Sequence, residues 1–222
     1  MKLLFGRMAC MGHGIMYLRY RGNAEIINMQ KARGDMLVRW INGGPRPKAD
    51  LLVNKMERQD IWGLIKQQED FAWFSCDKKP EYIVFDSYSD LVEQEFVHKT
   101  EGWAWTTVYS DMKHDADFEN TYECKGLAPI DVLKDAYDKL FTWIQEKYNV
   151  PVYYLHFSTK FEDREKFTSR GAELIKMMDE LAVKYSFLRS IHLPDEEVFS
   201  GNDGDPYHYT AQTFENFNKR MG

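Results

Sequence analysis

The 222-residue chain has few cysteines, no basic excess and no long apolar run, and each absence excludes a class of protein. Cys10, Cys76 and Cys124 are an odd number without CxxC spacing, in a chain long enough to form a core without disulfides. A disulfide-stabilised miniprotein is therefore excluded. No stretch approaches the roughly 18 apolar residues of a transmembrane helix, and Arg7 interrupts the N-terminal apolar run where a signal peptide would continue. We expect a cytoplasmic protein with no membrane partner.

The charge balance and the absence of certain motifs argue against nucleic acids, nucleotide cofactors and metals as partners. Twenty-nine Lys and Arg residues stand against 35 Asp and Glu residues, for a net charge of −6. Binding to a phosphate backbone usually requires clustered positive charge, so no nucleic-acid partner is expected. The sequence has neither a GxGxxG motif nor a Walker lysine, and the acidic residues around His114 match no metal-ligand spacing. We therefore predict no cofactor and no metal site.

The composition that is present is that of an ordinary globular protein with many aromatic residues. Hydrophobic residues make up 44% and charged residues 29%, which excludes a disordered chain and a collagen. Aromatic residues reach 15%, with 14 Phe, 13 Tyr and 6 Trp. The length suits one α/β domain with its own core, and there is no internal repeat or linker. We predict a single domain over 1–222 and need no oligomer to explain its stability.

Short apolar runs alternate along the chain with longer amphipathic segments. Segments that read as strands lie at 2–9, 24–29, 81–85, 150–157 and 187–193. Segments with helical spacing of apolar residues lie at 56–69, 129–148, 168–185 and 210–220, and 34–42 fits either state. This alternation predicts a parallel sheet covered by helices.

The segment at about 98–126 interrupts this alternation and reads as an insertion or a lid. It is polar and aromatic, with the run Gly102-Trp103-Ala104-Trp105 and a charged stretch after it. Two interpretations of its aromatic side chains stay open: they stack on sugar faces, or they form the packed underside of the lid. Packing is slightly favoured.

The segment 205–210, DPYHYT, stands directly before the last predicted helix and contains a candidate acid–base pair. Asp205 and His208 are three residues apart, so the carboxylate can hold one imidazole nitrogen while the other faces a pocket. His208 would then act as a general base. A solvated loop that happens to contain an Asp and a His is the alternative, and the position after the last strand favours the functional interpretation.

The DPYHYT segment, the strand VFDSYSD at 84–90 and the first strand with its small-residue turn together resemble the GDSL/SGNH hydrolase superfamily. The resemblance covers nearly the whole chain and points to an SGNH-like branch found with bacterial polysaccharide loci. It implies a flavodoxin-like three-layer α/β/α sandwich with a mostly parallel sheet, and ester hydrolysis or acyl transfer as the activity. It also implies that Asp205 and His208 are members of a catalytic triad.

The nucleophile is where the chain departs from the family. The family has a Gly-Asp-Ser turn after the first strand, whereas residues 6–14 contain no serine. Cys10 is the substitute, since its spacing to Gly14 mirrors that of the family's serine and glycine, and a helix N-terminus there would favour its thiolate. Two alternatives stay open: Cys10 is a small packing residue at a strand end, or it has a non-covalent role. Aligning Gly6 with the family's glycine would put Met8 at the nucleophile position and predicts an inactive protein.

The family's oxyanion hole consists of the nucleophile's backbone N–H, a glycine and an asparagine. The corresponding candidates here are the backbone amides of Met11 and Gly12, Gly44 in the second block, and Ser87 in place of the missing asparagine. For Ser87, capping of the helix after the strand is the favoured alternative. Asp86 either holds this loop or faces the site.

Two functions follow from these residues. The first is an SGNH-like hydrolase or acyltransferase that acts on an ester, for example an O-acyl group of a glycan, through Cys10, His208 and Asp205. Its partner would be a small-molecule or glycan ester. The second is a catalytically degenerate SGNH-like domain that binds a ligand or a protein, for example in a phage particle or in polysaccharide assembly. The acyl group and the oligomeric state are left open.

Overall fold

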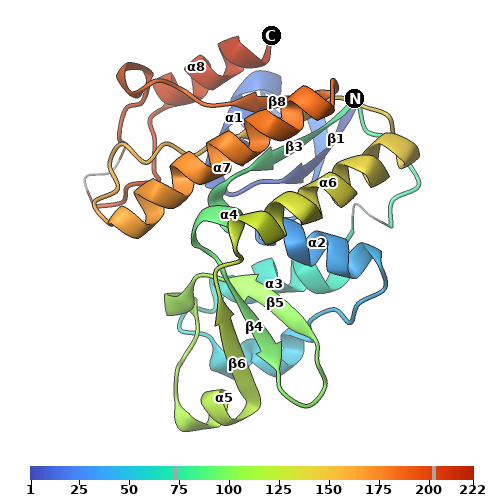
Figure 1. Cartoon of the computed structure of the whole chain (residues 1–222), viewed down its shortest axis with the longest axis vertical. Coiled ribbons are helices and arrows are strands. Elements are labelled where there is room, and N and C mark those ends of the chain that lie inside the picture. Colours follow the sequence, from blue (N-terminus) through green and yellow to red (C-terminus); the bar gives the residue numbers. More distant parts are fainter. Residues whose placement is uncertain (73–74, 202–203) are drawn as a thin grey trace.

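The main body of the protein is a five-stranded parallel sheet with helices on both faces (Figure 1). The computed structural model describes residues 1–72, 75–201 and 204–222. The strand order is β2-β1-β3-β7-β8, and every neighbouring pair is parallel. The strands are β1 (Lys2–Arg7), β2 (Ala24–Asn28), β3 (Tyr82–Asp86), β7 (Val152–Leu155) and β8 (Leu188–Ile191). The predicted α/β class with a mostly parallel sheet is confirmed.

The helices divide between the two faces as right-handed crossovers require. Helices α2, α6 and α7 lie side by side on one face, and α1 packs against α8 on the other (Figure 1). Their bounds are α1 (Cys10–Tyr20), α2 (Gly34–Ile41), α6 (Ile130–Lys147), α7 (Glu165–Lys184) and α8 (Ala211–Met221). The central strands are buried on both sides, which explains their continuous apolar runs such as Ile83-Val84-Phe85. Among the helices of the described residues, none is both long and apolar enough to cross a membrane.

The chain order reverses between β1 and β3, which are neighbours in the sheet. From β1 the chain passes to β2 on one side, while from β3 it continues to β7 and β8 on the other. Arg7 lies opposite Phe85, so the residues that follow the two strands emerge next to each other. Such a switch point is where open parallel sheets bind their ligands, at the carboxyl ends of the strands.

A smaller antiparallel sheet lies below the main one in Figure 1. Its order is β5-β4-β6, with β4 (Gln94–His98), β5 (Ala104–Thr107) and β6 (Tyr122–Gly126). It packs with η1 (Ala49–Lys55), α3 (Asp60–Asp70) and α5 (Ala116–Thr121). Together these elements form a second core, whose buried members are Ala49, Leu52, Met56, Ile61, Ile65, Phe96, Trp103, Trp105, Met112, Phe118 and Tyr122.

The second core decides how the aromatic residues of the predicted insertion are used. Trp103 and Trp105 are almost completely buried, so they pack and do not offer faces to a sugar. The antiparallel sheet begins at Gln94, a few residues before the predicted insertion, and it shares its core with residues 49–65. A local sequence pattern could not reveal this, because the two segments meet only through tertiary packing.

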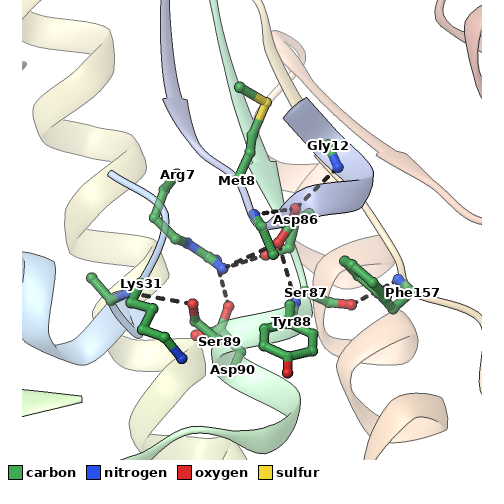
Figure 2. Close-up of polar contacts among 12 residues, drawn as sticks. Arg7, Met8, Gly12, Lys31, Asp86, Ser87, Tyr88, Ser89, Asp90 and Phe157 are labelled. Atoms are coloured by element: carbon green, nitrogen blue, oxygen red, sulfur yellow. Dashed lines mark hydrogen bonds and ion pairs between the residues drawn. The ribbon is translucent and has the colours of Figure 1, made fainter. Parts of the chain in front are cut away.

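A fully buried charge network links the carboxyl ends of β1 and β3 to the helices around them (Figure 2). Arg7 pairs with Asp90 of α4 (Tyr88–Val92), with 2.6 Å between Nη2 and Oδ2. The hydroxyls of Tyr137 and Tyr154 donate to the same Oδ2 at 2.6 and 2.7 Å, and the backbone N–H of Gly34 donates to Oδ1 at 2.9 Å. Burial alone would lower the pKa of Arg7, but Asp90, Tyr137, Tyr154 and Asp86 together outweigh it, and the pKa is raised well above its usual value.

Candidate functional site

A pocket of about 270 Å³ opens at the switch point between β1 and β3. Residues from both cores contribute to its walls. They are Ala9, Cys10, Gln30, Lys31, Arg58, Asp60, Leu64, Tyr88, Asp205, Tyr207 and His208. Three of the residues predicted to carry the chemistry, Cys10, Asp205 and His208, therefore meet in this Cys10 pocket.

Cys10 is the first residue of α1 and is exposed, so its thiol is accessible from the pocket. The protein atoms around the sulfur nevertheless desolvate it, and Asp86 adds a negative charge nearby. These two effects raise the pKa of Cys10 to about 11, although the backbone N–H of Met11 favours the thiolate. The expectation that a helix N-terminus would give a ready thiolate is therefore not met, because desolvation and carboxylate charge outweigh the helix end.

Asp86 holds the first turn of α1 in place from the end of β3 (Figure 2). Its Oδ2 accepts hydrogen bonds from the backbone N–H groups of Ala9 and Gly12 at 2.7 and 3.3 Å, and its Oδ1 accepts one from Tyr88 N–H at 3.3 Å. Ala9 occupies the N-cap position and has no side chain to cap the helix, so the buried carboxylate serves as the cap. Asp86 thus holds the loop and, through it, places Cys10.

The close approach of this turn to Asp86 requires glycine at position 12. A Cβ atom on Gly12 would lie 2.8 Å from Asp86 Oδ2 and 2.9 Å from the Met8 side chain. Burial raises the pKa of Asp86 to about 7, against the lowering effect of the Arg7 charge. Met8 itself is fully buried and lies outside the pocket lining, which favours the alignment with Cys10 at the nucleophile position.

Asp205 and His208 form the predicted pair. His208 Nδ1 lies 2.7 Å from Asp205 Oδ2, and the other carboxylate oxygen accepts a hydrogen bond from Tyr207 N–H at 2.8 Å. Tyr209 anchors the segment, since its hydroxyl donates to the carbonyl oxygen of Ser158 at 2.8 Å. With Nδ1 committed to the carboxylate, the proton stays on that nitrogen and Nε2 is left to accept one.

Cys10 and His208 line the same pocket but are not hydrogen-bonded to each other in the described part of the chain. Among residues 1–72, 75–201 and 204–222, no hydrogen bond joins Cys10 Sγ to the His208 ring. Catalytic contacts of this kind are often long in an empty site and shorten when substrate binds. The geometry therefore brings the predicted nucleophile and the predicted base to one cavity without a hydrogen bond between them among the residues that the structure describes.

The predicted oxyanion donors are only partly placed at the pocket. The Gly12 amide is used by Asp86, and the Met11 side chain is buried while its N–H lies at the Cys10 sulfur. Ser87 is buried, and its hydroxyl accepts a hydrogen bond from Phe157 N–H at 2.8 Å, so it neither caps α4 nor faces the pocket (Figure 2).

Gly44 ends the turn after α2, where its N–H donates to the carbonyl oxygen of Arg39 at 2.9 Å. It is not among the residues that line the pocket. This leaves the backbone amides of Cys10 and Met11 as the donors that the first turn of α1 can offer.

Lys31 and Arg58 were not found from the sequence, although both line the pocket. Lys31 follows β2, and Arg58 lies between η1 and α3. Neither stands in a motif, and nothing in the local sequence distinguishes them from the other Lys and Arg residues. Only the packing of the second core against the loop after β2 brings them to the same pocket as Cys10.

The fold and this site define a class: a three-layer α/β protein in which a cysteine and an Asp–His pair line one pocket at the switch point of the sheet. In the described part of the chain, no group of three His, Cys, Asp or Glu side chains could hold a metal ion. No family model and no curated protein sequence matches this chain.

Proposed function

We propose that this protein is an SGNH-like hydrolase or acyltransferase that acts on an ester through Cys10, His208 and Asp205. One observation carries the proposal: the Asp205–His208 pair, at 2.7 Å, lines the same pocket as Cys10. That pocket stands where parallel α/β sheets bind ligands. An O-acyl group on a glycan is a suitable substrate, because its leaving group is an alcohol that His208 can protonate.

The reaction proceeds in two halves. Cys10 Sγ attacks the acyl carbonyl carbon while its proton passes to His208 Nε2, and the tetrahedral intermediate then expels the alcohol, which takes that proton. This leaves a thioester on Cys10. In the second half, water attacks the thioester carbonyl, its proton passes to Nε2, and the C–S bond breaks as Sγ regains the proton. The product is the carboxylic acid, or a new ester when an alcohol replaces water.

The raised pKa of Cys10 makes the base essential. With a pKa of about 11 the thiol is protonated at neutral pH, so attack requires that the proton leave as the bond forms. Asp205 fixes the tautomer of His208 that can accept it. The N–H groups of Cys10 and Met11 at the start of α1 would stabilise the oxyanion.

The test compares the pocket residues with matched residues elsewhere. We expect Cys10→Ala and His208→Gln to lower the turnover of p-nitrophenyl acetate and of an acetylated oligosaccharide by at least about a hundredfold. Cys124 is an equally exposed cysteine outside the pocket, and His192 is an exposed histidine on another loop. Cys124→Ala and His192→Gln should leave turnover unchanged.

Mass spectrometry supplies a second readout. A thioester on Cys10 should add the mass of the acyl group to the intact protein, and in the Cys10→Ala variant this addition should disappear. Full turnover by Cys10→Ala would contradict the proposal, as would an acyl group attached at Cys124.

A catalytically degenerate domain that binds a ligand or partner protein is the second candidate. It is favoured by the two missing oxyanion donors, since Ser87 and Gly44 lie outside the pocket lining. On this reading an acetylated oligosaccharide binds with the same affinity to the wild type and to Cys10→Ala, and neither protein releases acetate. Calorimetry together with an acetate assay distinguishes the two candidates.

A further inference from the structure

The pocket that Cys10 lines also contains an arginine from the segment between η1 and α3. Arg58 lines the pocket, and 63% of its side chain is exposed. The backbone around it is held firmly: Glu57 N–H donates to the carbonyl oxygen of Asp111 at 2.9 Å, and Met56 forms a β-bridge with Met112. An exposed guanidinium on a fixed backbone segment therefore lies at an accessible cavity.

The acidic partners of Arg58 bind it loosely. Its Nη2 lies 3.4 Å from Asp111 Oδ1, and its Nε lies 3.7 Å from Asp60 Oδ1. Charge-assisted hydrogen bonds are usually about 2.7–2.9 Å long, so neither contact uses the guanidinium fully. Asp60 is also 67% exposed, and an ion pair in water at this distance contributes little.

Asp111 and Asp205 are already bound to other groups, whereas Asp60 is exposed and lines the pocket beside Arg58. Asp111 Oδ2 accepts hydrogen bonds from Lys31 Nζ at 3.0 Å and from the Thr107 hydroxyl at 2.6 Å. Asp205 is paired with His208. Lys31 also lines the pocket, but its ammonium group is almost fully buried between Asp111, at 3.0 Å, and Glu93, at 3.4 Å. Among the Lys and Arg residues that line the pocket, Arg58 is thus the accessible one, with donors that a ligand can use.

We infer that the pocket takes acyl compounds that carry an anionic group, a carboxylate or a phosphate, and that Arg58 binds this group while Cys10 attacks the acyl carbon. The binding of the anion by Arg58 stands by itself, whereas the attack of Cys10 on the acyl carbon rests on the proposed function. Arginine suits the task because its planar fork matches both anions in a bidentate arrangement.

A pair of alkylating reagents tests the anion site without any enzymatic turnover. Iodoacetate and iodoacetamide attack a thiol in the same way and differ in charge. We expect the ratio of their rates at Cys10 to fall several-fold in Arg58→Gln and less in Arg58→Lys. The ratio at Cys124 in the same molecules should not change, and Arg189→Gln, an exposed arginine outside the pocket, is the control variant. An unchanged ratio at Cys10 in Arg58→Gln would overturn the inference.

Protection experiments identify the anion. Glutarate and inorganic phosphate are each added during alkylation by iodoacetamide, and slower labelling of Cys10 by one of them names the group that binds. That protection should weaken by about tenfold or more in Arg58→Gln, because a charged hydrogen-bonding partner has been removed. Protection that is equal in the wild type and in Arg58→Gln would contradict the role of Arg58.

Ester pairs connect the anion site to the reaction. Mono-p-nitrophenyl glutarate and p-nitrophenyl valerate have acyl chains of equal length, and the first ends in a carboxylate. We expect kcat/KM to favour the glutarate ester in the wild type by about tenfold, and this preference should disappear in Arg58→Gln. Equal turnover of both esters by the wild type would overturn the inference and leave the proposed function standing. Turnover of neither ester, with the alkylation ratio still dependent on Arg58, would count against the proposed function alone.

Discussion

The protein contains two arginines placed between pairs of aspartates, and the two sites behave in opposite ways. Arg7 is completely buried, 2.6 Å from Asp90, and its guanidinium also donates to the carbonyl oxygen of Asp86. Arg58 is largely exposed, and its distances to Asp111 and Asp60 are 3.4 and 3.7 Å. In the first arrangement both terminal nitrogens of the guanidinium are bound and, among the described residues, only the buried Nε lacks a partner, whereas the second lies at an accessible cavity. A buried arginine with close acidic partners stabilises the fold, whereas an exposed arginine with unused N–H donors can bind a ligand.

The two arginine sites should differ most in how much their loss lowers the free energy of unfolding. Arg7→Met leaves Asp90 buried without its cation, and breaking a buried pair by removing one partner costs about 3–5 kcal/mol. We expect a loss of this size in the free energy of unfolding, measured by urea denaturation. Asp90→Asn should cause a comparable loss, since it leaves Arg7 uncompensated. A loss below about 1 kcal/mol in both variants would mean that the network is not a stabilising link.

The protonation of Asp86 should make the free energy of unfolding depend on pH. Its pKa is raised from 3.8 to about 7, so the folded state binds a proton that the unfolded state has already lost. The stability contributed by this group is complete below about pH 4 and is lost as pH rises through about 7, with a slope of at most about 1.4 kcal/mol per unit. Urea denaturation at about pH 5 and pH 8 measures it.

Asp86→Asn is the matched variant, because it keeps the side-chain shape and cannot ionise. The fall in stability between the two pH values should be smaller in this variant than in the wild type. An equal fall in both proteins would show that another group causes the pH dependence.

The smallest effect on stability is expected at the open site. Arg58→Gln removes loosely held ion pairs near solvent, so its free energy of unfolding should stay within about 0.5 kcal/mol of the wild type. Its alkylation ratio at Cys10 should nevertheless change. A large destabilisation by Arg58→Gln would remove the contrast with Arg7 and make both arginines structural.

The strands and helices of the main body were predictable because their signal is local. Buried parallel strands show as short apolar runs, and covering helices show as apolar faces at helical spacing. The second core was predicted only in part, because the buried side chains of residues 94–126 pack against buried side chains of residues 49–65. A pattern read along the chain does not contain that pairing.

The candidate site also contains features that the local sequence predicts and features that depend on tertiary packing. Asp205 and His208 are three residues apart in one segment, so their pairing at 2.7 Å could be predicted from their spacing. Cys10 could be assigned to the end of the first strand, but its high pKa depends on desolvation by the surrounding protein and on Asp86, the last residue of another strand. Ser87 was expected to cap a helix or face the site, whereas its hydroxyl binds Phe157 N–H on the neighbouring strand connection.

By itself, the sequence determined the α/β class, the position of the cysteine after β1 and the Asp–His pair before the last helix, because each depends on residues close together in the chain. Tertiary structure alone decided that Asp86 caps α1, that Arg7 is enclosed and that Arg58 lines the same pocket as Cys10. Burial and the nearest charges set the pKa values and the free donors of these groups. Those surroundings come from segments that the chain brings together only when it folds.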